Sequence, residues 1–157
     1  MENIRSAYNV GNILRTADAL GRSACCAGYT PHPESSRKVD KTALWALWSD
    51  VLPQFWHPRA CYEWYRQHGY VLLAAETVDD ALDVRRFVDM LGGDDELLAS
   101  VRAWCMGVIV WNETEGVLPE TLGLVDASLM ISMRGEKESL NVGQAAAIMM
   151  RELSRLL

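Results

Sequence analysis

Apolar residues along the chain gather into continuous runs that predict buried strands. Three such runs cover residues 70–75, 106–111 and 128–133, and a shorter candidate covers residues 23–29. A strand that is covered on both faces carries continuous apolar residues, whereas a strand with one solvated face alternates apolar and polar ones. The pattern therefore predicts a sheet with both faces covered, as in mainly parallel sheets.

Between these runs, apolar positions recur at helical spacing. In residues 10–20 the apolar side chains fall on one face, and Gly21 marks the end of the helix. A polar, proline-containing loop is predicted for residues 30–40. Further helices are predicted for residues 41–48, 59–68, 94–104 and 141–157. Strands that alternate with helices predict an α/β fold, with a mainly parallel sheet flanked by helices.

The size and composition of the chain suit one globular domain. Its 157 residues, half of them apolar, suffice for a single core. No apolar run approaches the roughly 20 residues that span a bilayer, and the first residues lack the charged-then-apolar pattern of a secretory signal. We therefore expect one domain over residues 1–157 that works in the cytoplasm and does not enter a membrane.

The cysteines and histidines give no sign of a metal site. The four cysteines include no C-x-x-C pair, and the three histidines do not cluster with them in the sequence. A structural zinc site needs four converging ligands, commonly in close pairs. We expect no bound metal and interpret the cysteines as buried free thiols.

The charged residues are unevenly distributed. The net charge is −6, yet the first 41 residues carry six basic and four acidic side chains, whereas residues 76–126 carry three basic and twelve acidic ones. A nucleic-acid surface would therefore be built from the N-terminal third, with Arg5, Arg22, Lys38 and Lys41 as candidate contacts. On charge alone, a solvated acidic surface without a partner explains the imbalance better.

Three polar segments adjoin the predicted elements and carry side chains that a core does not need. The first holds Asn9, which fits a helix N-cap, and Arg15, which fits a surface ion pair. Residues 112–117 fit a turn after a strand, and the third segment holds Ser139 and Asn141, either of which fits the N-cap of the last helix. Ligands of parallel sheets nevertheless bind beyond the carboxyl ends of the strands, where such segments meet.

In their order and spacing, the three segments together resemble the motifs of the SpoU/TrmH family of RNA methyltransferases, within the SPOUT superfamily. Residues 9–17 (NVGNILRTA) are similar to the family's first motif, and residues 112–116 (NETEG) to its second. Residues 131–142 (ISMRGEKESLNV) are similar to its third. The loop over residues 28–33 (GYTPHP), with residues 38–44 (KVDKTAL), is similar to one branch of the family.

The resemblance implies a fold and an activity. Members are α/β proteins whose C-terminal part forms a trefoil knot, and they work as homodimers. They bind S-adenosylmethionine and transfer its methyl group to a ribose 2'-hydroxyl of tRNA or rRNA. The resemblance places the cofactor contacts at Trp111, Asn112, Gly116, Ile131, Met133 and Leu140. It places the catalytic groups at Asn9, Arg15, Glu113, Ser139 and Asn141.

The reaction accounts for these residue types. A neutral hydroxyl is a weak nucleophile, so the protein must align it and favour loss of its proton. Arg15 can bind the adjoining phosphate and stabilise negative charge on the oxygen, but a guanidinium stays protonated and is a poor base. We therefore assign Arg15 an electrostatic role. Hydrogen bonds would come from Asn9, Ser139 and Asn141, and Glu113 would hold Arg15 or a partner polar group.

The sequence departs from the family pattern at a few positions. Trp111 stands where the family has glycine, Ser132 where it has proline and Gly143 where it has serine. Relatives have a sheet strand directly before the first motif. We expect either that this chain lacks that strand or that the native chain starts upstream of Met1. If Trp111 impairs cofactor binding, the alternative is a non-catalytic RNA-binding relative. A third hypothesis is a knotted dimeric scaffold without RNA contact.

Overall fold

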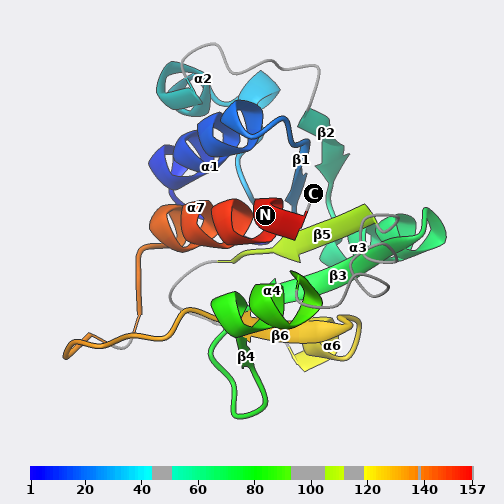
Figure 1. Ribbon diagram of the computed structural model, residues 1–157. Coiled ribbons are helices and arrows are strands. Elements are labelled where there is room, and N and C mark those ends of the chain that lie inside the picture. The colour runs from blue at the N-terminus through cyan, green and yellow to red at the C-terminus, as the bar shows by residue number, and fades with distance from the viewer. Residues whose placement is uncertain (44–50, 93–104, 112–118, 138, 157) are drawn as a thin grey trace.

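The computed structural model describes residues 1–43, 51–92, 105–111, 119–137 and 139–156. Its strands are β1 (Ala24–Ala27), β2 (Val51–Phe55), β3 (Tyr70–Ala75), β4 (Leu82–Asp83), β5 (Cys105–Ile109) and β6 (Ala127–Met130). Its helices are α1 (Ala7–Ala19), α2 (Arg37–Ala43), α3 (Pro58–Gln67), α4 (Val84–Gly92), α6 (Pro119–Leu122) and α7 (Val142–Leu153), with short 3-10 turns η1 (Pro33–Ser35) and η3 (Ser154–Leu156). Strands and helices alternate along most of the chain, which confirms the predicted α/β class (Figure 1).

All described strand pairs are parallel. β3 lies between β5 and β6 in a sheet of order β4-β6-β3-β5, and β1 pairs with β2 in a second sheet. Glu2 bridges the two sheets, because it pairs with Ala27 at the end of β1 and with Trp111 just after β5. The Glu2 amide donates to the Val110 carbonyl, and the Ala27 amide donates to the Met1 carbonyl, both at 2.8 Å. The N-terminal residues thus lie between β1 and β5.

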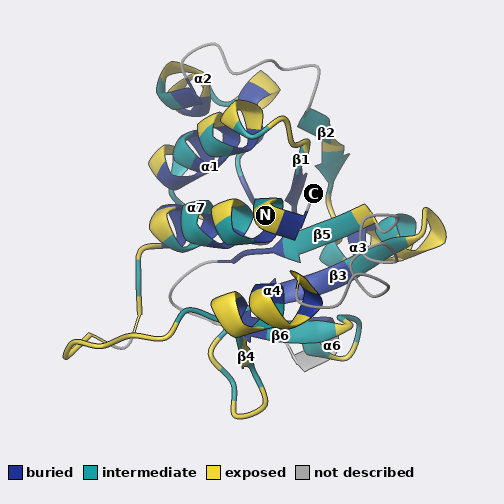
Figure 2. Ribbon diagram, in the orientation of Figure 1, coloured by how far each residue is buried: buried dark blue, intermediate teal, exposed yellow. Residues whose placement is uncertain are grey.

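Helices cover both faces of the four-stranded sheet, which explains the continuous apolar runs. In β3, Leu73 packs in a buried cluster with residues of α4 and α7. Its neighbours Leu72 and Ala74 belong to a different cluster, with Cys61 and Tyr62 of α3. Successive side chains of a strand point to opposite faces, so the two clusters lie on opposite sides of β3. A third cluster joins α1, α2 and α7, whose buried sides face one another (Figure 2).

Two differences from the predicted elements have simple local causes. α1 begins at Ala7 rather than at residue 10, because the Ser6 hydroxyl accepts a hydrogen bond from the Asn9 amide at 3.3 Å. The interpretation of Asn9 as the N-cap is therefore wrong, and Ser6 is the cap. β2 was not predicted from the sequence, and it contains Pro53, a residue without an amide hydrogen. β2 belongs to a two-stranded sheet, whose edges tolerate a missing donor.

The remaining differences concern three other segments. The predicted loop over residues 30–40 contains η1 and the start of α2. β4 and α4 were not predicted from the sequence. The predicted helix over residues 94–104 lies outside the described residues, and that over 41–48 is described only as far as residue 43.

Candidate active site

The carboxyl ends of three neighbouring strands surround a cavity of about 160 Å³. Because β3 lies between β5 and β6, the segments that follow these strands leave the sheet side by side. The cavity is lined by Ala75, Glu76 and Thr77 after β3, Val110 and Trp111 after β5, Leu129, Met130 and Ile131 at the end of β6, Met133, Ser139 and Leu140 before α7, and Val142, Ala145 and Met149 on α7. It occupies the place where parallel sheets commonly bind ligands.

The described members of the predicted cofactor set all line this cavity, namely Trp111, Ile131, Met133 and Leu140. Ser139 of the predicted catalytic set lines it as well. The predicted site residues of the second motif, Asn112, Glu113 and Gly116, lie outside the described residues. The fold thus brings Trp111, directly before the second motif, and described residues of the third motif to one space beyond the sheet.

Asn9 and Asn141 meet at the N-terminal ends of α1 and α7. The side-chain amide of Asn141 donates a hydrogen bond to Asn9 Oδ1 at 3.2 Å, although 132 residues separate the two. Asn141 Oδ1 also accepts a hydrogen bond from the Gly143 amide at 2.9 Å, so Asn141 is the N-cap of α7. Asn141 therefore caps its own helix and also joins the third motif to the first.

Gly11 lets α1 pack closely against α2 (Figure 1). A Cβ at Gly11 would lie 2.5 Å from Thr42 Cβ on α2, which is closer than two carbon atoms can approach. A Cβ at Gly143 would lie 3.2 Å from the capping oxygen of Asn141. Gly143 thus leaves room for the Asn141 side chain that caps α7 and contacts Asn9.

The core accommodates the tryptophan that departs from the family pattern. Trp111 is 8% exposed and belongs to the buried cluster that contains Cys61, Tyr62 and Ile109. Among the described residues other than glycine, only Asn3 has a positive φ. Trp111 therefore adopts a backbone conformation that any residue can take. Replacing glycine here imposes no backbone strain, and the indole packs with the core.

Asp83 ties the third motif to the sheet, a role that was not predicted from the sequence. Its carboxylate accepts a hydrogen bond from the Ser132 amide at 3.2 Å, and it caps α4 by accepting from the Arg85 amide at 3.0 Å. Hydrogen bonds from Ser132, with those from the α4 amides, lower the pKa of Asp83 below its ordinary value. The sequence contains a signal for this cap, because Asp83 directly precedes an amphipathic run, and Asp is a common N-cap residue.

A buried carboxylate, also missed, stands where the two sheets meet. Glu2 is 2% exposed and accepts hydrogen bonds from the hydroxyls of Tyr62 and Thr121. Burial, together with the nearby Glu2, raises the pKa of Tyr62 well above its ordinary value, so the phenol stays protonated and donates. Thr121 lies in α6, so this network ties α6 to the N-terminal residues between the two sheets.

The predicted RNA contacts divide between two parts of the molecule. Arg5 precedes α1, while Lys38 and Lys41 lie on α2, and all three are exposed. Arg22 follows α1 and lines a second cavity, at the amino ends of β1 and β5. The Arg5 guanidinium lies 5.9 Å from the centre of the half-exposed Tyr29 ring.

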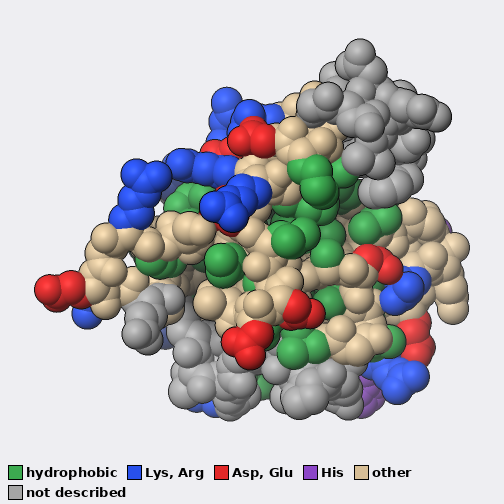
Figure 3. Space-filling model, turned by 60° about the horizontal axis from the view of Figure 1, so that its bottom comes forward, with side chains coloured by type: hydrophobic (Ala, Val, Ile, Leu, Met, Phe, Trp, Pro, Cys, Tyr) green, Lys and Arg blue, Asp and Glu red, His purple; other side chains and the backbone are tan. Residues whose placement is uncertain are grey.

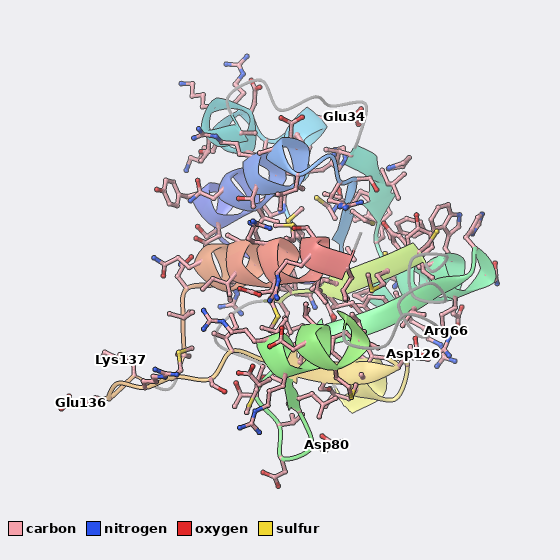
Figure 4. All side chains as sticks on the ribbon, viewed as in Figure 1. Glu34, Arg66, Asp80, Asp126, Glu136 and Lys137 are labelled. Atoms are coloured by element: carbon pink, nitrogen blue, oxygen red, sulfur yellow. The ribbon has the colours of Figure 1, made fainter. Side chains whose placement is uncertain are left out.

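Charge is also unevenly spread over the folded surface. In the view of Figure 3, Lys and Arg side chains gather toward the upper left, and apolar side chains lie in the middle of the face. Lys137 and Glu136 lie at the tip of the segment before α7, which projects from the body of the protein (Figure 4). Arg15 is exposed on α1, and it is absent from the described residues that line the candidate active-site cavity.

The cysteines differ in their surroundings. Cys25, Cys26 and Cys61 are buried free thiols as expected, but the expectation is wrong for Cys105, which is exposed at the start of β5. Within the described ranges, no group of three or more His, Cys, Asp or Glu side chains is placed to hold a metal ion. No helix in the described part of the chain is long and apolar enough to cross a membrane.

Two known tRNA methyltransferases are similar in sequence to nearly the whole chain. The chain is 28% identical over 160 residues to a tRNA (guanosine(18)-2'-O)-methyltransferase of Thermus thermophilus, covering 99% of this chain and 72% of that one. It is 28% identical to the enzyme of the same name from Escherichia coli, covering 99% of this chain and 61% of the relative.

Two solved structures share the fold. The SpoU methyltransferase AviRb from Streptomyces viridochromogenes in complex with AdoMet matches with a TM-score of 0.78 and 25% identity, over 98% of this chain and 57% of that one. The AdoMet-bound rRNA methyltransferase from Sinorhizobium meliloti matches with a TM-score of 0.80 and 23% identity, over 98% and 54%. The chain thus spans little more than half of either protein. Residues 1–151 match the model of the SpoU rRNA Methylase family, so the resemblance of the three motifs is confirmed and the chain belongs to that family.

Proposed function

We propose that the protein transfers a methyl group from S-adenosylmethionine to a ribose 2'-hydroxyl of tRNA or rRNA. The observation that supports this most is the cavity beyond β3, β5 and β6, lined by Trp111 and by residues of the third motif, in a chain of the SpoU family. The relatives from Thermus and Escherichia are named as tRNA 2'-O-methyltransferases. The structures from Streptomyces and Sinorhizobium are described with AdoMet bound.

The lining of the cavity suits this cofactor chemically. Leu129, Val142 and Met149 provide apolar contacts for a purine ring and a methylene chain, as small-molecule sites commonly do. Glu76, directly after β3, offers a carboxylate, the group that often accepts hydrogen bonds from a nucleoside ribose at the end of a strand. When bound, the cofactor supplies a methyl group carried on a positively charged sulfur. The residues proposed to hold it are Trp111, Asn112, Gly116, Ile131, Met133 and Leu140.

The protein's own groups would align the hydroxyl and ease the loss of its proton. We propose that Asn9, Asn141 and Ser139 bind the target ribose, because the first two are already joined and the third lines the cavity. Arg15 would bind the adjoining phosphate and stabilise negative charge on the oxygen. Glu113 would hold Arg15 or a neighbouring polar group in place.

The position of Arg15 supports a homodimer. Since Arg15 is exposed on α1 and is absent from the described lining of its own chain's cavity, we propose that a second copy brings its Arg15 to this site. RNA would contact Arg5, Lys38 and Lys41, and the Tyr29 ring beneath Arg5 offers a flat surface for a base. The C-terminal trefoil knot, a reaction without metal and a cytoplasmic location are further parts of the proposal, and family membership supports them.

Methyl transfer from labelled S-adenosylmethionine to unmodified tRNA and rRNA tests the proposal. Arg15→Ala should lower the rate about 100-fold or more, the usual effect of losing a group that stabilises charge at the reacting centre, and leave cofactor affinity nearly intact. Arg59→Ala is the matched control, because it removes an exposed arginine of α3 that pairs with its helix neighbour Glu63. Equal rates for Arg15→Ala and the wild type would show that the catalytic centre is misplaced. Failure of the wild type to bind cofactor at millimolar concentration would favour the non-catalytic RNA-binding relative.

A further inference from the structure

The second cavity, of about 360 Å³, gathers three cysteines at the amino ends of β1 and β5. Cys25 lies on β1, Cys61 on α3 and Cys105 at the start of β5. Glu2, which bridges the two sheets, pairs beyond the last residue of β5. No described β-bridge joins β1 to β5 at their amino ends. The cavity lies in that space and has no part in the proposed methyl transfer.

Two of these cysteines face each other. The Sγ atoms of Cys25 and Cys61 are 3.3 Å apart, and both residues are free and buried. A disulfide bond is about 2.05 Å long, so the sulfurs need to approach by only about 1 Å, which small side-chain rotations can supply. Cys26, next to Cys25, contacts the Pro31 carbonyl instead, because successive side chains of a strand point to opposite faces.

The two thiols are chemically unequal. A hydrogen bond from Cys61 lowers the pKa of Cys25, and the same contact raises the pKa of Cys61. Cys25 is therefore the thiol that ionises first, and a thiolate is the reactive form of cysteine. Cys25 can therefore act as the nucleophile, and Cys61 as the thiol that attacks the oxidised Cys25.

We propose that Cys25 and Cys61 form a dithiol site that a two-electron oxidant of the peroxide class converts to a disulfide. The Cys25 thiolate attacks one oxygen of hydrogen peroxide, the O–O bond breaks, and the released hydroxide takes up a proton to become water. The Cys25 sulfenic acid that results is attacked by the Cys61 sulfur, the S–O bond breaks, and a second water leaves with the Cys61 proton. Two thiols and one hydrogen peroxide thus yield one disulfide and two waters.

The cavity gives the oxidant a route to the buried sulfurs. Its wall includes the exposed residues Arg22, Ser23 and Cys105, so it reaches the surface. Hydrogen peroxide is little larger than water, which takes up roughly 30 Å³ in the liquid, and the cavity is far larger than that. Access therefore requires no unfolding.

Oxidation of the purified full-length chain, followed by alkylation and peptide mass mapping, tests the inference. Hydrogen peroxide should remove two of the four titratable thiols and produce a peptide linked through Cys25 and Cys61, and a dithiol reductant should restore all four. Cys26→Ser, the adjacent control, should still form this link. Cys61→Ser should form no bridge and should leave a Cys25 sulfenic acid that dimedone traps.

A probe that needs no oxidation keeps the inference testable if a variant folds poorly. Phenylarsine oxide, a trivalent arsenical that bridges two close thiols, should bind the wild type with one arsenic per chain and protect both Cys25 and Cys61 from alkylation. Four free thiols after peroxide treatment would overturn the proposal, and so would a link formed through Cys105 in place of Cys25 or Cys61.

Discussion

The contact between Asn9 and Asn141 yields a quantitative prediction for the packing beside the candidate active site. Asn141→Ala removes the hydrogen bond that caps α7 and the one that joins α7 to α1. Loss of an N-cap costs about 1 kcal/mol, and loss of a hydrogen bond to a buried carbonyl oxygen costs about 1 kcal/mol more. Asn9 is only 5% exposed, so water does not readily replace the missing donor. The free energy of unfolding should therefore fall by about 2 kcal/mol.

Asn141→Ser separates the two contributions. Serine caps a helix about as well as asparagine does, but its shorter side chain cannot reach Asn9. This variant should lose about 1 kcal/mol, half as much as the alanine variant. Urea unfolding followed by tryptophan fluorescence, at one fixed protein concentration, measures both values. An alanine variant as stable as the wild type would show that neither hydrogen bond of Asn141 stabilises the fold, and a fully stable serine variant would show that the contact between the helices contributes nothing.

Three other substitutions test further parts of the account. Gly11→Ala forces a Cβ against Thr42 and should lower the free energy of unfolding by about 1–3 kcal/mol, and an unchanged Tm would contradict this contact. Tyr62→Phe removes a donor from the buried Glu2 carboxylate and should cost about 1–3 kcal/mol in urea unfolding, whereas full stability would mean that other groups satisfy the carboxylate. The pKa of Asp83 is lowered in the fold, so its carboxylate stabilises the protein above its ordinary pKa of about 3.9, and this contribution disappears as pH falls through the lower folded value. Thermal melts below pH 4 should therefore show a smaller acid loss for Asp83→Asn than for the wild type, and parallel profiles would count against the assignment.

The sequence predicted the elements whose burial is regular. β3 runs from Tyr70 to Ala75, as its continuous apolar residues indicated, because helices cover both of its faces. β2 was not predicted, because Pro53 argues against a strand. Only the structure shows that β2 lies at a sheet edge, where a proline is tolerated. Periodicity also cannot say which strands become neighbours. The order β4-β6-β3-β5 emerges only from the fold.

The candidate site was predictable only through the resemblance to a family. Asn9 and Asn141 meet across 132 residues, and no local spacing encodes such a contact. The buried network around Glu2 could not be predicted for the same reason, since Glu2 contacts Thr121 across 119 residues. Whether a tryptophan fits at position 111 could be decided only from the structure, because only the backbone torsion and the surrounding cluster show that a large side chain is accommodated there.

The cavity beyond β3, β5 and β6 is proposed to bind S-adenosylmethionine, and calorimetric titration with the cofactor measures this binding. The wild type should bind one cofactor per chain. Ala145→Phe should abolish binding, because Ala145 lines the cavity and a phenyl ring would fill it. Ala147→Phe, two residues further along α7 and absent from the described lining, should bind like the wild type. A wild type that binds no cofactor, or an Ala145→Phe variant that binds with full affinity, would contradict the account.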